Sequence, residues 1–178
     1  HGALPILVYA GMKSFRETND RNVGRMVVSQ QRREALSNEN LLLANMDSLT
    51  ELSNRRAFFT HLEVELEKAR AAGTRLALGV IDLDGFKPVN DLHGHAAGNA
   101  VLCAVAERLR HLTPHTGLAA RLGGDEFAIL APLDQGSEGL ARLAQGVIAA
   151  IASPVLWQGN ALKIGATVGI APASADHA

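Results

Sequence analysis

The sequence predicts an α+β fold in which helices pack on a mainly antiparallel sheet. An apolar run at residues 76–83 is typical of a short, fully buried strand. Two further β-prone runs, 118–122 and 127–130, are joined through paired glycines and therefore indicate a hairpin. Segments with helical spacing separate these strands. The order helix, strand, helix, strand, strand, helix, strand fits a ferredoxin-like or split βαβ arrangement.

The first 46 residues are expected to form a helical signalling or linker segment. Residues 13–46 are rich in charge, lack proline and carry a narrow apolar stripe, which fits one long helix or two shorter ones. Such a helix either packs on its own domain or finds a partner, and its heptads are too broken to predict a coiled coil. The apolar run Ala3–Ala10 is either the tail of a membrane span or a packing segment. We therefore expect a cytoplasmic protein, anchored at the inner membrane in its full-length form under the first alternative.

The globular part is expected to begin at Asp47. A polar turn over 47–56 leads into an amphipathic helix, which Gly73 ends. The residues expected on the buried face of this helix are Phe58, Phe59, Leu62 and Leu66.

After the first strand, the sequence predicts a loop or short helix at 86–90 and a turn flanked by Gly94 and Gly98. Residues 99–112 then form a second helix, in which Cys103 is expected to be a buried thiol. The inward residues of that helix are expected to be Val101, Leu102, Val105, Ala106 and Leu109.

Beyond the hairpin, a third helix is expected over 137–152, where Pro154 stops it, and a last strand over 161–170.

Composition narrows the possible classes of protein. The 178 residues fit one domain plus an extension, and the 47% hydrophobic content is enough for a core. The net charge of −1 excludes a global basic field, so no nucleic-acid partner is expected. A single cysteine excludes a disulfide framework and a cysteine-based zinc site.

Two acidic motifs are the candidate functional residues. Asp125 and Glu126 follow the paired glycines at the expected hairpin tip, where the open backbone lets a ligand approach. Asp82 ends the buried strand, a place where α/β proteins commonly build sites. If the two strands are neighbours, these carboxylates converge and can hold one or two Mg²⁺ ions against a triphosphate. Each motif alone is also a common turn sequence, so the hypothesis depends on their joint occurrence.

Together these residues resemble the GGDEF domain family, the diguanylate cyclases. The residues Gly123–Phe127 match the motif that names the family letter for letter. Residues 82–91, continued by 94–98, resemble its second signature. Residues 47–56 resemble its opening motif, and residues 167–170 its late strand. Four motifs in the right order make this resemblance far more specific than any one of them.

The resemblance implies a palm-like fold related to the nucleotidyl cyclases. It also implies that two GTP are condensed into cyclic di-GMP with loss of pyrophosphate. Each subunit of a homodimer would present one GTP, and Mg²⁺ or Mn²⁺ would serve as the cofactor. An upstream sensor would then control activity through the dimer geometry, and a downstream phosphodiesterase domain is a further expected partner in the full-length protein.

The family's catalytic residues correspond to Asp82, Asp125 and Glu126 in this chain. The resemblance makes Asp82 and Asp125 metal ligands, with the backbone carbonyl of Leu83 as a third. Glu126 would lie beside the metal and help to activate the ribose 3′-hydroxyl.

The substrate-binding residues that the resemblance implies surround these acids. Lys87 and the backbone of Phe86 would contact phosphates, and Asn90 would hydrogen-bond the guanine edge. Gly123 and Gly124 would let the backbone pass close to the nucleotide.

The chain departs from the family at Asn99, where an Asp usually accepts hydrogen bonds from guanine. An amide offers one acceptor oxygen and a donor with no use there, so Asn99 either weakens GTP binding or relaxes base preference. Alternatively, Asn99 caps a helix beginning at Ala100. The family also continues beyond the length given, so the domain expected over 47–178 lacks its last helix and strand.

Four functions are therefore weighed. An active diguanylate cyclase leads, because the acids and Lys87 are intact. A degenerate GTP-binding domain that modulates a linked cyclic di-GMP phosphodiesterase follows, because of Asn99. A cyclase that accepts ATP and a dimerisation module without nucleotide are the remaining two.

Overall fold

The computed structural model describes residues 24–37, 40–41, 44–113, 117–134 and 136–173. The chain divides into two compact units, His1–Ala44 and Asn45–Ala178. In the first unit residues 24–37 are helical, and every side chain of that stretch is exposed. The apolar run Ala3–Ala10 lies outside the described residues. Over the described ranges, no helix is long and apolar enough to cross a membrane.

The second unit is built on a five-stranded sheet with the order β1-β3-β4-β2-β7. Its strands are β1 (Ser53–Asn54), β2 (Leu76–Asp84), β3 (Leu118–Gly123), β4 (Glu126–Pro132) and β7 (Gly165–Ala173). The short β1 runs parallel to β3, and the other neighbours are antiparallel. The predicted mainly antiparallel sheet is therefore confirmed, with β3 and β4 as the predicted hairpin.

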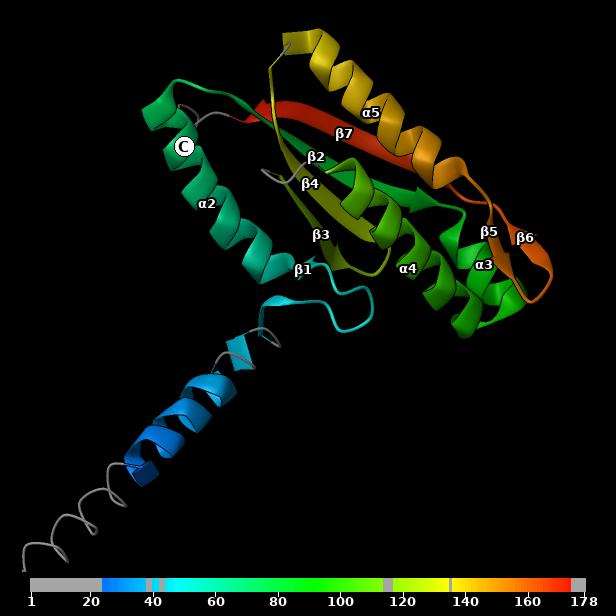
Figure 1. The fold of residues 1–178 in the computed structure, drawn as a ribbon. Helices are drawn as coiled ribbons and strands as arrows, with labels where there is room; N and C mark the ends of the chain where they lie inside the picture. The colour runs from blue at the N-terminus through cyan, green and yellow to red at the C-terminus, as the bar shows by residue number, and fades with distance from the viewer. Residues whose placement is uncertain (1–23, 38–39, 42–43, 114–116, 135, 174–178) are drawn as a thin grey trace, which may run out of the picture. The chain divides into compact units, whose positions relative to one another are not determined.

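Helices cover both faces of this sheet (Figure 1). They are α2 (Arg55–Ala72), α3 (Phe86–His93), α4 (His95–Leu112) and α5 (Gly136–Ala152). α2 packs on one face, and α4 and α5 pack on the other. A small hairpin of β5 (Val155–Trp157) and β6 (Asn160–Leu162) precedes β7.

Local sequence explains where α2 begins and ends. The side chain of Asn54 accepts a hydrogen bond from the N–H of Ala57 at 3.0 Å, which caps the first turn. Gly73 ends the helix as predicted, with a φ of 65° that favours glycine. Phe58 of this helix is buried, whereas Phe59 is 45% exposed, so the prediction that Phe59 lies on the buried face was wrong.

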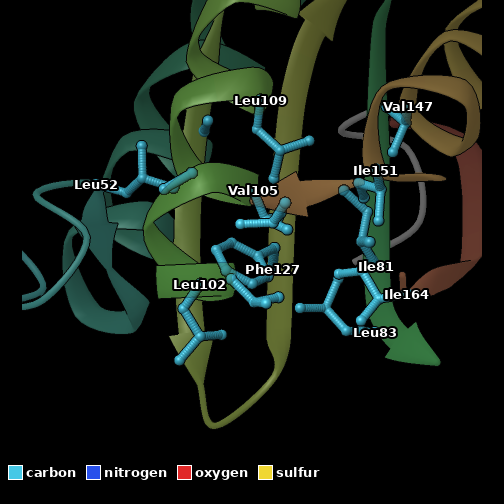
Figure 2. Close-up of a cluster of buried hydrophobic side chains, with 14 of the residues drawn as sticks. Leu52, Ile81, Leu83, Leu102, Val105, Leu109, Phe127, Val147, Ile151 and Ile164 are labelled. Carbon is cyan, nitrogen blue, oxygen red and sulfur yellow. The ribbon is translucent and has the colours of Figure 1, made fainter. Parts of the chain in front are cut away.

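The larger core lies between the sheet and α4 and α5 (Figure 2). Ile81 and Leu83 of β2 and Phe127 of β4 point into it and are almost fully buried. All five residues predicted to face inward from α4 are buried as well. Each of the larger side chains among them contributes about 1.5–3 kcal/mol of transfer free energy, so this layer holds the ends of β2 and β4 in place.

The start of α4 differs from the prediction. The helix begins at His95 because Gly94, with a φ of 85°, ends α3 and starts α4. Gly98 therefore lies inside the helix rather than in a turn, and Asn99 is not a cap. The thiol of Cys103 is exposed rather than buried.

The end of the chain is also more divided than expected. The single strand predicted over 161–170 is split between β6 and β7, because β6 turns back to pair with β5.

Candidate functional site

Alternation along β2 and β4 separates the acidic side chains from the core. In β2, Asp82 and Asp84 are exposed while Leu83 between them is buried. In β4, Glu126 is exposed and Phe127 is buried. Successive side chains of a strand point to opposite faces. The buried residues thus fix the strands, and the acids emerge together on the face opposite α4 and α5.

The strand register brings the predicted acids together. Asp82 and Glu126 are direct partners across β2 and β4. The N–H of Leu83 donates to the carbonyl of Asp125 at 3.2 Å, which places the hairpin tip beside the end of β2. Like charges that face each other across strands are destabilising. No ion pair to Asp82, Asp125 or Glu126 is recorded in the part of the chain that the structure describes, so these carboxylates form an uncompensated negative site.

The hairpin tip depends on its two glycines. Gly123 and Gly124 have φ values of 144° and 52°, which residues other than glycine rarely adopt. No atom lies within 4 Å of a Cβ built at either position. There is therefore open space beside the backbone at both glycines, and the predicted approach of a ligand at this tip stays a prediction.

α3 and α4 bring the other predicted residues to the end of β2. Gly85, with a φ of 81°, separates β2 from α3, so Phe86 and Lys87 begin the helix directly after the acids. The Lys87 side chain is exposed, and Phe86 packs against the larger core.

Asn90 of α3 lies against α4 at Gly98. A Cβ on Gly98 would lie 1.9 Å from Asn90 Oδ1, so only glycine leaves room for this amide in its present position. Asn99 follows as an exposed residue of α4. The structure therefore places Asn90 and Asn99 at the same helix junction, near the N-terminus of α4.

The acids fit a divalent metal, although they do not enclose one. Carboxylate and carbonyl oxygens are the hard ligands that Mg²⁺ and Mn²⁺ prefer. Within the described ranges, no group of three or more His, Cys, Asp or Glu is arranged to hold a metal ion. Mg²⁺ usually takes only one or two carboxylates and completes its shell with water and substrate phosphates. Asp82, Asp125 and the Leu83 backbone match that partial set.

Asp84 has a different role from Asp82. The hydroxyl of Thr167 in β7 lies 3.0 Å from both carboxylate oxygens of Asp84. Gly165 lies beside it, and a Cβ built on Gly165 would be 3.5 Å from the Cβ of Asp84, an ordinary contact distance. This contact ties Asp84 to Thr167, the residue that faces Asp82 across β2 and β7.

Sequence reasoning missed a second group of residues that reach the hairpin tip. Arg121 of β3 donates from Nε and Nη2 to the carbonyl oxygen of Gly124, at 3.0 and 2.8 Å. Its Nη1 donates to both carboxylate oxygens of Asp47, at 3.2 and 3.3 Å. Asp47 Oδ1 also accepts from the N–H and the hydroxyl of Thr50, at 2.9 and 2.7 Å. The Asp-x-x-Thr spacing was the signal, since Asp side chains often bond the backbone of the turn they begin.

These contacts set the charge state of Asp47. Partial burial raises the pKa of its carboxyl, but the Thr50 hydroxyl, the Thr50 N–H and the Arg121 guanidinium together outweigh burial. The pKa of Asp47 therefore lies below its ordinary value, and the carboxylate is ionised at neutral pH.

Comparisons of the sequence with known proteins all point to the same family. The sequence profile described as "Diguanylate cyclase, GGDEF domain" matches residues 44–178. The diguanylate cyclase TpbB of Pseudomonas aeruginosa is 44% identical over 141 residues, which cover 76% of this chain and 32% of TpbB. The cyclic di-GMP phosphodiesterase NbdA of the same species is 39% identical over 128 residues, covering 72% of this chain and 16% of NbdA.

Solved structures with a similar fold come from the same family. The coiled coil and GGDEF domain of DgcB from Caulobacter crescentus, solved in complex with cyclic di-GMP, superimposes with a TM-score of 0.76 at 27% identity. The match covers 88% of this chain and 83% of that chain. This chain spans about a third of TpbB and about a sixth of NbdA.

Proposed function

This chain belongs to the GGDEF domain family, and from that membership we propose that it is a diguanylate cyclase domain. Its reaction condenses two GTP into cyclic di-GMP and releases pyrophosphate. Catalysis takes place between two copies of the domain, each presenting one GTP, and an upstream sensor sets their geometry. The observation that carries the proposal is the pair of facing carboxylates, Asp82 and Glu126, beside the glycine-rich tip.

The acids of the site bind the divalent metal ion and the ribose 3′-hydroxyl that attacks the phosphate. Asp82, Asp125 and the Leu83 carbonyl would bind Mg²⁺ or Mn²⁺. When bound, the metal neutralises charge at the attacking and leaving oxygens of the phosphoryl transfer. Glu126 lies on the same face as Asp82 and accepts a hydrogen bond from the ribose 3′-hydroxyl, which orients that oxygen toward the α-phosphorus.

The neighbouring residues bind the nucleotide. Lys87, at the start of α3, pairs with the phosphates as a flexible cation. The amide of Asn90, lodged against Gly98, hydrogen-bonds the guanine edge. Gly123 and Gly124 let the backbone approach the nucleotide without a side chain in the way.

Product analysis tests this proposal directly. The complete natural protein is incubated with Mg²⁺ and either GTP or ATP, and the products are separated by chromatography and mass. We expect cyclic di-GMP from GTP. Asp125→Asn keeps the size of the side chain but removes the charge, and we expect a loss of at least about 10²-fold in rate. Asp134→Asn, at an exposed position after β4, is the matched control.

Two results would refute the assignment. Full activity in Asp125→Asn would show that the hairpin acid has no part in turnover. A protein that releases no cyclic dinucleotide from either nucleotide, while remaining folded by circular dichroism, is not a cyclase.

A second candidate function is favoured by Asn99 alone. In that reading the domain binds GTP without turning it over and modulates a linked cyclic di-GMP phosphodiesterase. NbdA, a cyclic di-GMP phosphodiesterase that contains a segment matching this chain, is a relative with such a linkage. An inactive natural protein that becomes active as Asn99→Asp would favour this function. Product from ATP would instead mark a change in base choice.

A further inference from the structure

One guanidinium joins two parts of the second unit that are far apart in sequence. Arg121 binds the carboxylate of Asp47, 74 positions away, and also the carbonyl of Gly124 at the hairpin tip. We propose that Arg121 is a positioning residue that aligns the tip acids with the turn formed by residues 47–52. We call this segment the leading turn. The inference rests on the proposed cyclase function for its kinetic readout, but its geometric readout is independent.

The first step is that only an arginine satisfies both contacts. Its planar fork presents several N–H donors in fixed directions. Here Nε and Nη2 donate to the carbonyl oxygen of Gly124, while Nη1 donates to the carboxylate of Asp47. A lysine ammonium is a point charge on a flexible stem, so it cannot donate two hydrogen bonds to the Gly124 carbonyl and a third to the Asp47 carboxylate at the same time.

The second step is that the tip needs an external restraint. Gly123 and Gly124 lack side chains that would limit their backbone angles. The Gly124 carbonyl is bound by Arg121, and the next carbonyl, that of Asp125, is bound by the N–H of Leu83. These two bonds fix consecutive peptide groups that precede and follow the Asp125 side chain. Loss of the first frees the tip on one side.

The third step is that the leading turn is itself firmly placed. Asp47 and Thr50 bond each other, and Thr50 is only 5% exposed. From α4, Arg110 Nη2 donates to the carbonyl of Thr50 at 3.2 Å. The thiol of Cys103 donates to the carbonyl of Leu49 at 3.4 Å. The leading turn therefore offers Arg121 a fixed partner.

The fourth step is the low exposure of the pair. The side chains of Arg121 and Asp47 are 14% and 22% exposed, whereas each of the other ion pairs in the described ranges has at least one member that is 45% or more exposed. Partly buried, doubly hydrogen-bonded pairs hold geometry better than exposed ones. A displacement of about 1 Å at a reacting group can lower a rate by about 10²-fold.

The test combines kinetics with amide hydrogen exchange in the complete natural protein. Arg121→Lys keeps the charge but loses the fork, and Arg70→Lys is the matched control at an exposed position of α2. For Arg121→Lys we expect kcat to fall by about 10–10²-fold, with KM changing less than about threefold. We also expect the amides that hold the tip to exchange about tenfold faster, above all the N–H of Leu83, which donates to the Asp125 carbonyl, while those in the middle of the core strands do not change.

Asp47→Asn tests the other end of the link. Because Asp47 and Arg121 act through one contact network, the double variant should lose no more activity than the worse single variant. Losses that multiply would overturn the proposal, since Arg121 would then act without the leading turn. Equally, unchanged tip exchange or near-normal kcat in a folded Arg121→Lys would overturn it. If the unmodified protein makes no product, the proposed function fails, and the exchange of the tip amides alone still decides the role of Arg121.

Discussion

The facing carboxylates of Asp82 and Glu126 predict a conflict between stability and activity. Glu126→Gln retains shape and polarity but removes one of two like charges that oppose each other across β2 and β4. We expect the variant to be more stable than the natural protein when no metal is present, and to have lost turnover. Strained or repulsive arrangements of this kind are kept where function needs them.

The size of this effect follows from the strand geometry. Directly paired residues have Cβ atoms about 4.5–5.5 Å apart, and such cross-strand pairs contribute about 0.2–1 kcal/mol. Both side chains are exposed, so solvent screening keeps the repulsion within this range. For a domain of this size, about 1 kcal/mol corresponds to a Tm shift of about 4 °C. The expected gain in Tm is therefore about 1–4 °C.

The assay is thermal unfolding in two buffers. With EDTA and no nucleotide, Glu126→Gln should unfold at the higher temperature. With Mg²⁺ and a non-hydrolysable GTP analogue, the natural protein should gain about 2.7 kcal/mol at 100 times its Kd. The variant should gain less at the same concentration, because it lacks the carboxylate that holds the ribose 3′-hydroxyl beside the metal, so the gap in Tm should shrink or reverse. Glu63→Gln, on the exposed side of α2, should change Tm equally in both buffers. Added salt should narrow the gap seen in EDTA.

Two results would refute this reasoning. A Glu126→Gln variant that is no more stable than the natural protein in EDTA would mean that the two carboxylates do not repel each other. A gap in Tm that stays the same with Mg²⁺ and nucleotide would mean that the Glu126 carboxylate takes no part in binding them.

Two further predictions concern other parts of the second unit. Gly98→Ala should keep or raise Tm, since alanine favours helix by up to about 1 kcal/mol, but it should raise the KM for GTP at least about tenfold because it displaces the Asn90 amide. Gly146→Ala in α5, where a Cβ meets only ordinary contacts, is the control. An unchanged KM in Gly98→Ala would contradict the role of Asn90 in binding GTP. The ionised Asp47 stabilises the fold because its pKa is lower in the folded protein than in the unfolded chain. This stabilisation is complete above the pKa of the unfolded chain, about 3.9, and it is lost as pH falls through the lower pKa of the folded protein. The slope of Tm against pH below pH 4 should therefore be shallower in Asp47→Asn, and identical slopes in the two proteins would contradict the assignment.

Local signals were enough to predict the main elements of the second unit. The apolar run of β2, the glycine-joined hairpin and Gly73 at the end of α2 each depend on residues close in sequence. The acids at the end of β2 and at the hairpin tip were predictable for the same reason. Their meeting required only that two antiparallel strands be neighbours.

Tertiary packing explains the predictions that were wrong. Gly98 looked like a turn residue, but it is a helical residue that leaves room for Asn90 of another helix. For that reason Asn99 was assigned to the start of a helix that in fact begins at His95. The thiol of Cys103 is exposed because Cys103 lies outside the inward face of α4, whose nearest buried residues are Leu102 and Val105.

The link through Arg121 was beyond sequence reasoning for a different reason. Asp47 and Arg121 are 74 positions apart, and neither periodicity nor turn chemistry relates two such residues. Only the parallel pairing of β1 with β3 brings the leading turn next to the hairpin strand.

The alternation along β2 and β4 has a consequence for how such domains evolve. Even-numbered residues such as Asp82 and Glu126 carry the chemistry, and their odd-numbered neighbours such as Leu83 and Phe127 carry the fold. A mutation at one of the acids therefore removes activity and leaves the domain folded, whereas a mutation at one of the buried neighbours disrupts the fold itself. Lineages can lose or retune the reaction while inheriting an intact scaffold, and the same domain then persists as a folded module free to acquire another task.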